Sequence, residues 1–304
     1  MRNHAPFSAL IGIPNRWPDG TDHSAELSWN TSNHSVLDVT DNGDEYLMLD
    51  GETQTLSARM QTRLSSKVQL GVDIPWLQHS GGYLDSVIDA WHDLFGLPEG
   101  IRPLTPNDQL NYVYEKNGVE VFQLDERKSG LGDIQIAMAL DLGTIGDSES
   151  SYLGRVPWKL TFNLKLPTGE VEKLTGSGNV DVAAGVGIRS PGGARLDWWL
   201  DMGLVWPGDV DIVGLDSSGQ IYYYDGAVAW RLLTNLDLLL QLAGHTALYQ
   251  ANVTMLGEPA MQLGVGAMWH VSDKFAMRFG FFEDLRAESA PDFGIELAFV
   301  FKHF

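Results

Sequence analysis

The sequence contains no cysteine, few basic residues and no long hydrophobic run. The absence of cysteine is compatible with passage through an oxidising periplasm, although export does not require it. No segment approaches the run of about 20 apolar residues that a membrane helix needs. Only 20 basic residues accompany 40 acidic ones, and the net charge of −20 argues against nucleic acid or an anionic membrane surface as a partner.

Composition by itself resembles that of an ordinary soluble protein, with 44% hydrophobic residues and a mean hydropathy of −0.11. The length of 304 residues does not decide between one domain and two. A transmembrane β-barrel would escape a hydropathy test, because only every second residue of each strand must face lipid.

What the sequence does contain is twelve segments of alternating apolar and polar residues between about residue 22 and the end of the chain. Tight turns are expected at 65–66, 190–193, 234–235 and 272–273. Long connections are expected at 33–44, 80–130, 168–177, 207–219, 249–259 and 285–291. In an outer-membrane barrel the short turns face the periplasm and the long loops face outside. The pattern predicts an all-β, antiparallel up-and-down barrel of about 12 strands over residues 21–304, with both termini in the periplasm.

The two faces of the expected strands differ in charge. The segment from Leu236 places four leucines at 236, 238, 240 and 242 on one face, opposite Asp237 and Gln241. None of the apolar faces carries Lys or Arg, which would cost roughly 2–4 kcal/mol at the middle of a bilayer. Aromatic residues at segment ends predict girdles at the membrane interfaces; these are Trp29, Trp76, Trp158, Trp206, Trp230 and Trp269.

The opposite faces predict a lumen lined by charges of both signs. The expected lining residues are Arg59, Arg63, Asp73, Asp141, Lys159, Lys165, Asp181, Arg189, Asp197, Asp201, Arg231, Asp237, Arg278 and Glu296. Mutual neutralisation in a narrow lumen is the stronger interpretation, because buried charges must be paired. A selective channel remains an alternative if the charges segregate by height.

Two segments fit no strand. Residues 1–20 contain three prolines, which a central strand does not accommodate, and we expect a plug in the lumen or else a periplasmic arm. The expected plug residues are Pro6, Phe7, Leu10, Ile11 and Pro14. The start of the chain has no apolar stretch typical of a signal peptide, so an exported protein would here be in its mature form.

The long 80–130 connection predicts a short extracellular helix followed by a hairpin. Apolar residues recur at helical spacing and predict either a helix packed on the outer rim or a lid over the pore; they are Leu84, Val87, Ile88, Trp91, Leu94 and Phe95. The hairpin is expected over 112–121, with Asn117 and Gly118 in its turn.

No catalytic, cofactor or metal site is expected. His34 with Ser35 and His245 with Thr246 are the pairs nearest to a lipid hydrolase, but neither lies in a nucleophile motif. Asp209, Asp211 and Asp216 lack the spacing of a calcium loop. We expect such loop acids to form a solvated outer surface that meets lipopolysaccharide.

The stretch 129–133 (Ser-Gly-Leu-Gly-Asp), which leads into an alternating strand, resembles a motif of Gram-negative outer-membrane barrels. It is similar to barrels for uptake of aromatic compounds and to an uncharacterised proteobacterial barrel family known as a domain of unknown function. Three short segments, 3–7, 12–14 and 50–52, are similar to that uncharacterised family. The resemblance implies a distant relation to channels for fatty acids or aromatic hydrocarbons.

Taken together, the sequence predicts an outer-membrane channel for passive uptake of a small hydrophobic molecule, in contact with outer-membrane lipid and lipopolysaccharide. The alternative is a barrel without transport that scaffolds another envelope protein or lipopolysaccharide. A lipid-modifying enzyme is a third, weaker interpretation.

Overall fold

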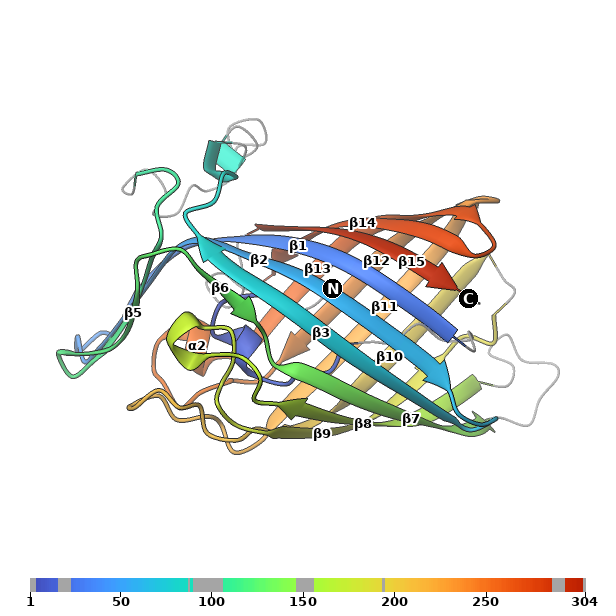
Figure 1. Cartoon of the computed structure of the whole chain (residues 1–304), viewed down its shortest axis with the longest axis horizontal. Helices are drawn as coiled ribbons and strands as arrows, with labels where there is room; N and C mark the ends of the chain where they lie inside the picture. The colour runs from blue at the N-terminus through green and yellow to red at the C-terminus, as the bar shows by residue number, and fades with distance from the viewer. Residues whose placement is uncertain are drawn as a thin grey trace.

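The computed structural model of the chain describes residues 4–15, 23–86, 88–89, 106–145, 156–192, 195–285 and 293–302. Twelve strands of these residues form one closed antiparallel barrel (Figure 1). The barrel strands are β1 (His23–Val39), β2 (Glu45–Arg63), β3 (Val68–Ser80), β7 (Ile134–Ile145), β8 (Val156–Leu166), β9 (Asp181–Arg189), β10 (Leu196–Trp206), β11 (Ile221–Leu233), β12 (Leu236–His245), β13 (Ala260–Ser272), β14 (Phe275–Asp284) and β15 (Phe293–Lys302).

Each barrel strand pairs with the next one along the chain, and β1 pairs with β15 to close the cylinder. The closing register runs from Ser24 opposite Lys302 to Asn33 opposite Phe293. Closure removes both free edges, which a sheet in lipid cannot leave unpaired. The predicted all-β barrel of about twelve strands is confirmed. Among the described residues no helix is long and apolar enough to cross a membrane.

The two ends of the barrel differ. At one end, here called the turn end, the expected short connections join β2 to β3, β9 to β10, β11 to β12 and β13 to β14, and the chain also ends there (Figure 1). The other end, here called the loop end, carries the longer connections. They contain the short helices η3 (Val171–Lys173) and α2 (Thr254–Gly257).

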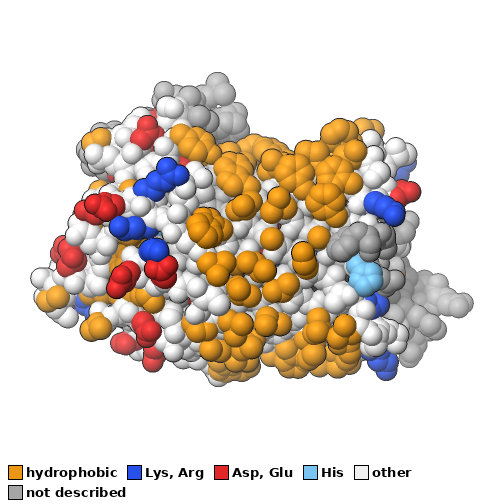
Figure 2. Space-filling view, in the orientation of Figure 1, with side chains coloured by type: hydrophobic (Ala, Val, Ile, Leu, Met, Phe, Trp, Pro, Cys, Tyr) orange, Lys and Arg blue, Asp and Glu red, His pale blue; other side chains and the backbone are white. Residues whose placement is uncertain are grey.

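Outward-facing apolar side chains form a belt around the barrel (Figure 2). On β12, Leu238, Leu240 and Leu242 are exposed, whereas Asp237, directly before them, points inward and is buried. Charged side chains gather beyond the belt at the ends of the molecule (Figure 2). The alternation read from the sequence therefore separates a lipid-facing surface from the lumen.

The sequence-based prediction of a long connection over residues 33–44 is wrong. β1 continues to Val39 and β2 resumes at Glu45, so only residues 40–44 form a turn. Above the apolar belt these strands no longer meet lipid, so their outward faces need not be apolar and their composition looks like that of a loop.

Three short strands extend the sheet at the loop end. The hairpin of β4 (Asn111–Lys116) and β5 (Val119–Leu124) was predicted, and β4 pairs with the upper part of β2. β6 (Lys128–Leu131) pairs with the upper part of β3 and returns the chain to the barrel.

An apolar core of buried residues lies at the loop end of the barrel. It combines residues of the N-terminal segment, the β4–β5 hairpin and the connections that follow β10 and β12; its members include Phe7, Leu10, Leu49, Tyr112, Leu124, Val210, Ile212, Tyr249 and Leu256. The loops thus fold inward over the barrel and bury one another.

We expect Leu240→Arg to destabilise the barrel, because it places a cation on the lipid face near the middle of β12. The cost should be about 2–4 kcal/mol, measured by urea unfolding in lipid vesicles. The adjacent Gln241→Arg faces the lumen beside Asp225 and should cost clearly less. Equal losses for the two variants would contradict the assignment of the faces.

Candidate functional site

The N-terminal segment, residues 4–15, lies inside the barrel toward the loop end. Its residues 8–10 form the short helix η1 (Ser8–Leu10), and Phe7, Leu10 and Ile11 are buried. Pro6 is also buried, whereas Pro14 is partly exposed. All five residues predicted to belong to a plug therefore lie on this segment, which has no strand pairing with the barrel wall.

Contacts from several sides hold the segment across the lumen. Ser32 of β1 donates to the carbonyl of His4 (3.2 Å), and the ring of His4 lies 5.9 Å from that of Phe282 on β14. At the far end of the segment, the Asn15 side chain donates to Asp73 of β3 (2.9 Å).

The apolar part of the segment packs against the loop-end core. The ring of Phe7 meets the rings of Phe122 and Tyr249 edge to face, at centroid distances of 5.9 and 6.4 Å. Burial raises the pKa of Tyr249 well above its usual range, so its hydroxyl stays protonated. That hydroxyl donates to the carbonyl of Phe7 (2.7 Å).

A buried charge cluster, here called the latch, grips the middle of the segment. Lys165 of β8 lies 3.2 Å from Asp133 and 3.0 Å from Asp181, and all three side chains are buried. The Lys165 ammonium also donates to the carbonyl of Leu10 (2.5 Å). The backbone N–H of Gly12 donates to Asp181 (2.6 Å). The latch therefore binds the segment through both its N–H and C=O groups.

The carboxylates of the latch also organise the surrounding loops. Asp133 accepts the backbone N–H groups of Gly169 (2.9 Å) and Ser177 (3.0 Å). Asp181 accepts the backbone N–H of Gly208 (3.0 Å). One buried lysine is thus surrounded by two carboxylates that fix three separate pieces of chain. This arrangement satisfies the rule that buried charges be paired and hydrogen-bonded.

A second group, the central ion cluster, crosses the seam where the barrel closes. Arg278 of β14 contacts Glu26 of β1 (3.0 Å) and Glu296 of β15 (2.5 Å). Arg59 of β2 contacts the same Glu26 (3.2 Å) and Asp73 of β3 (3.2 Å). Five charged side chains from five strands, two arginines and three carboxylates, therefore pair with one another inside the lumen.

The remaining predicted lining residues lie nearer the turn end. Asp237 contacts Arg231 (3.2 Å) and His270 (2.8 Å). Asp197 accepts a hydrogen bond from Ser190 (2.9 Å). The last five predicted residues are Arg63, Asp141, Lys159, Arg189 and Asp201; the first four line a solvent-open cavity, and Asp201 lies 3.9 Å from Lys159.

Three residues of these groups are absent from the predicted lining: Glu26 of the central ion cluster, Asp133 of the latch, and Lys67, which lines the cavity at the turn end. Glu26 has the phase of the inward face of β1, and Asp133, directly before β7, has the phase of the inward Gln135, so alternation could have found both. Lys67 lies in a turn, where alternation assigns no face.

The predicted lid is only partly described. Leu84 and Ile88 are buried, and residues 85–86 and 88–89 are helical. Glu52 accepts the backbone N–H groups of Tyr83 (2.9 Å) and Leu84 (2.5 Å), which fixes the start of this helix. Val87, Trp91, Leu94 and Phe95 lie outside the described residues.

Neither histidine pair considered for hydrolysis forms a nucleophile–base pair with its neighbour. The ring of His34 lies 3.2 Å from the hydroxyl of Ser32, and the ring of His245 contacts the carbonyl of Thr246 (2.9 Å). Within the described parts of the chain, no three His, Asp or Glu residues are grouped to hold a metal ion.

A closed antiparallel barrel with an apolar belt and a charged lumen defines the class as an outer-membrane β-barrel with the fold of a channel. The chain belongs to the family described as a protein of unknown function, DUF3187, whose match spans residues 1–303. No curated protein matched the chain.

Solved structures similar to this chain include outer-membrane channels and porins. The COG4313 outer membrane channel from Pseudomonas putida F1 has a TM-score of 0.58 and 11% identity, over 97% of this chain and 98% of that one. The NanC porin has a TM-score of 0.49 and 6% identity, over 93% and 100%. The CymD monoaromatic hydrocarbon channel has a TM-score of 0.44 and 11% identity, over 93% and 89%. At 11% identity, the first similarity shows the fold.

We expect Arg278→Met to destabilise the protein by about 3 kcal/mol or more, because Glu296 would lose its partner in the central ion cluster. The matched control is Arg231→Met, whose side chain is 47% exposed beside Asp237 and should cost about 0–1 kcal/mol. Urea unfolding of both variants in lipid vesicles gives the comparison. A loss for Arg278→Met no greater than for the control would contradict the structural role of the cluster.

Proposed function

We propose that this protein is an outer-membrane channel through which a small solute diffuses passively, with residues 4–15 as its gate. The observation that carries the proposal is how this segment is held. It crosses the lumen but contributes no strand to the barrel. It can therefore leave without breaking a single ladder hydrogen bond of the wall.

The gate has a polar and an apolar attachment. The latch binds Leu10 and Gly12 through hydrogen bonds to Lys165 and Asp181. Phe7 is held by aromatic contacts and by the Tyr249 hydroxyl. The hydrogen bonds between the segment and the latch can be exchanged for hydrogen bonds to water. Displacing residues 4–15 toward the turn end would therefore cost less free energy than unfolding the barrel.

The lining favours a polar solute over the hydrophobic one predicted from the sequence. Beyond the gate, a solute meets the central ion cluster and then the charged cavity at the turn end. An apolar molecule would displace the water around these charges without offering them hydrogen bonds. We therefore propose a polar substrate, and the apolar residues of the lumen's loop end belong to the closed gate.

The gate can be tested by crowding it without changing the barrel wall. A Cβ atom at Gly12 would lie 2.9 Å from Cβ of Lys165 and 3.1 Å from Cβ of Asp181. Gly12→Val should therefore push the segment off the latch. We expect a several-fold rise in single-channel conductance in planar lipid bilayers, and deletion of residues 4–15 should give a rise at least as large.

The matched control is Gly219→Val, because nothing lies within 4 Å of a Cβ atom added at Gly219. Its conductance should equal that of the unmodified protein. The heat-dependent gel migration typical of folded barrels verifies that each variant is folded. If folded protein lacking residues 4–15 conducts no more than the intact chain, the assignment of this segment as a gate is wrong. If neither conducts at all, the scaffold alternative gains over a channel.

A further inference from the structure

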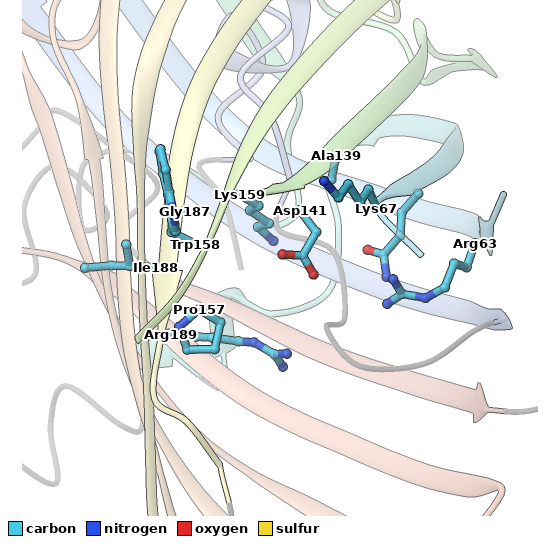
Figure 3. Close-up of a pocket in the computed structure, with 11 residues that line it drawn as sticks. Arg63, Lys67, Ala139, Asp141, Pro157, Trp158, Lys159, Gly187, Ile188 and Arg189 are labelled. Atoms are coloured by element: carbon cyan, nitrogen blue, oxygen red, sulfur yellow. The ribbon is translucent and has the colours of Figure 1, made fainter. Parts of the chain in front are cut away.

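Most of the charged side chains that line the cavity at the turn end are cations. Its side chains include Arg63, Lys67, Lys159 and Arg189, against the single carboxylate of Asp141 (Figure 3). This group is called the basic vestibule here. The cavity is open to solvent, so a small solute that enters the lumen can reach these side chains.

Strand register brings these residues to one level of the barrel. Arg63 of β2 is opposite Gln69 of β3, and Asp141 of β7 is opposite Lys159 of β8. Lys159 is in turn opposite Gly187 of β9, two residues before Arg189. Lys67 comes from the β2–β3 turn, where its carbonyl accepts the N–H of Asp141 (2.7 Å). The vestibule is therefore built from five neighbouring strands of the barrel and one turn.

Gly187 keeps the floor of the vestibule open. A Cβ atom there would lie 2.8 Å from Cε of Lys159, as well as in contact with the carboxylate of Asp201. The absence of a side chain lets both groups lie over the glycine. Their separation of 3.9 Å is at the outer limit of an ion pair.

The charges of the vestibule do not balance. Among the described residues, four cations line the cavity with Asp141, and counting Asp201 as well leaves four minus two, an excess of two positive charges. The central ion cluster contrasts with it, since three carboxylates there surround two arginines. Positive charge is thus concentrated at one height of the lumen.

We propose that the basic vestibule binds a small soluble anion bearing carboxylate or phosphate groups, and that it makes the channel anion-selective. Guanidinium groups bind such oxyanions through two parallel hydrogen bonds, and Arg63 and Arg189 supply two. A cleft that is lined by charges of one sign and enclosed by low-dielectric walls concentrates ions of the opposite sign. The vestibule lies inside the barrel, so its ligand comes from solution rather than from lipid head groups. This inference rests on the proposed channel and names its substrate class.

The first test measures ion preference in planar bilayers of zwitterionic lipid under a potassium chloride gradient. The protein with Gly12→Val should pass chloride several-fold more readily than potassium. Adding R63Q, K67Q and R189Q should bring the two permeabilities close to equal. Replacing Arg63 and Arg189 by lysine instead should retain the preference, because charge is kept.

The control variant, with R127Q, K128Q and K173Q, removes three positive charges from the loop end instead. It should leave the preference for chloride over potassium unchanged. A channel that prefers potassium would overturn the proposal. Chloride preference that persists in the folded vestibule triple variant would also overturn it.

The second test needs no conduction. Citrate and inorganic phosphate are titrated separately into the detergent-solubilised protein in a calorimeter at low salt. We expect binding of at least one of them, at least ten-fold weaker in the vestibule triple variant and unchanged in the loop-end control. Binding without any current would refute the channel and retain the site. Current without binding of either anion would refute the site and retain the channel.

Discussion

The structure depends on one constraint, that no backbone hydrogen-bonding group can be left unpaired in lipid. Pairing of β1 with β15 meets it by closing the sheet. Closure also turns twelve inward faces toward one another and takes their charges out of bulk water. The ion clusters, the latch and the buried N-terminal segment are consequences of this enclosure, because each supplies partners for groups that would otherwise be buried alone.

The charges of the lumen are arranged by height. The latch and the central ion cluster are nearly balanced and bind structural elements to one another. The basic vestibule at the turn end has an excess of positive charge and an open volume. The first two groups therefore stabilise the closed state, while the vestibule is the site that we propose for a solute.

Much of this fold could be predicted from the sequence. Alternation at period two identified the twelve strands and the inward direction of side chains such as Arg59, Lys165 and Arg278. The turn residues Asn117 and Gly118 predicted the β4–β5 hairpin. The continuation of β1 through His34 and beyond was missed, because strands above the lipid lose the apolar face that makes them recognisable. The α2 helix (Thr254–Gly257) is too short to show helical periodicity.

The sequence by itself determined the class of the protein, the lipid-facing surface and the mixture of charges in the lumen. These follow from local alternation, which needs no knowledge of distant residues. Only the tertiary structure decided which charges meet, because a pairing such as Glu26 with Arg278 depends on the register of β1 against β15. It also decided that Lys165 would bind Leu10, since the N-terminal segment reaches it through space rather than along the chain.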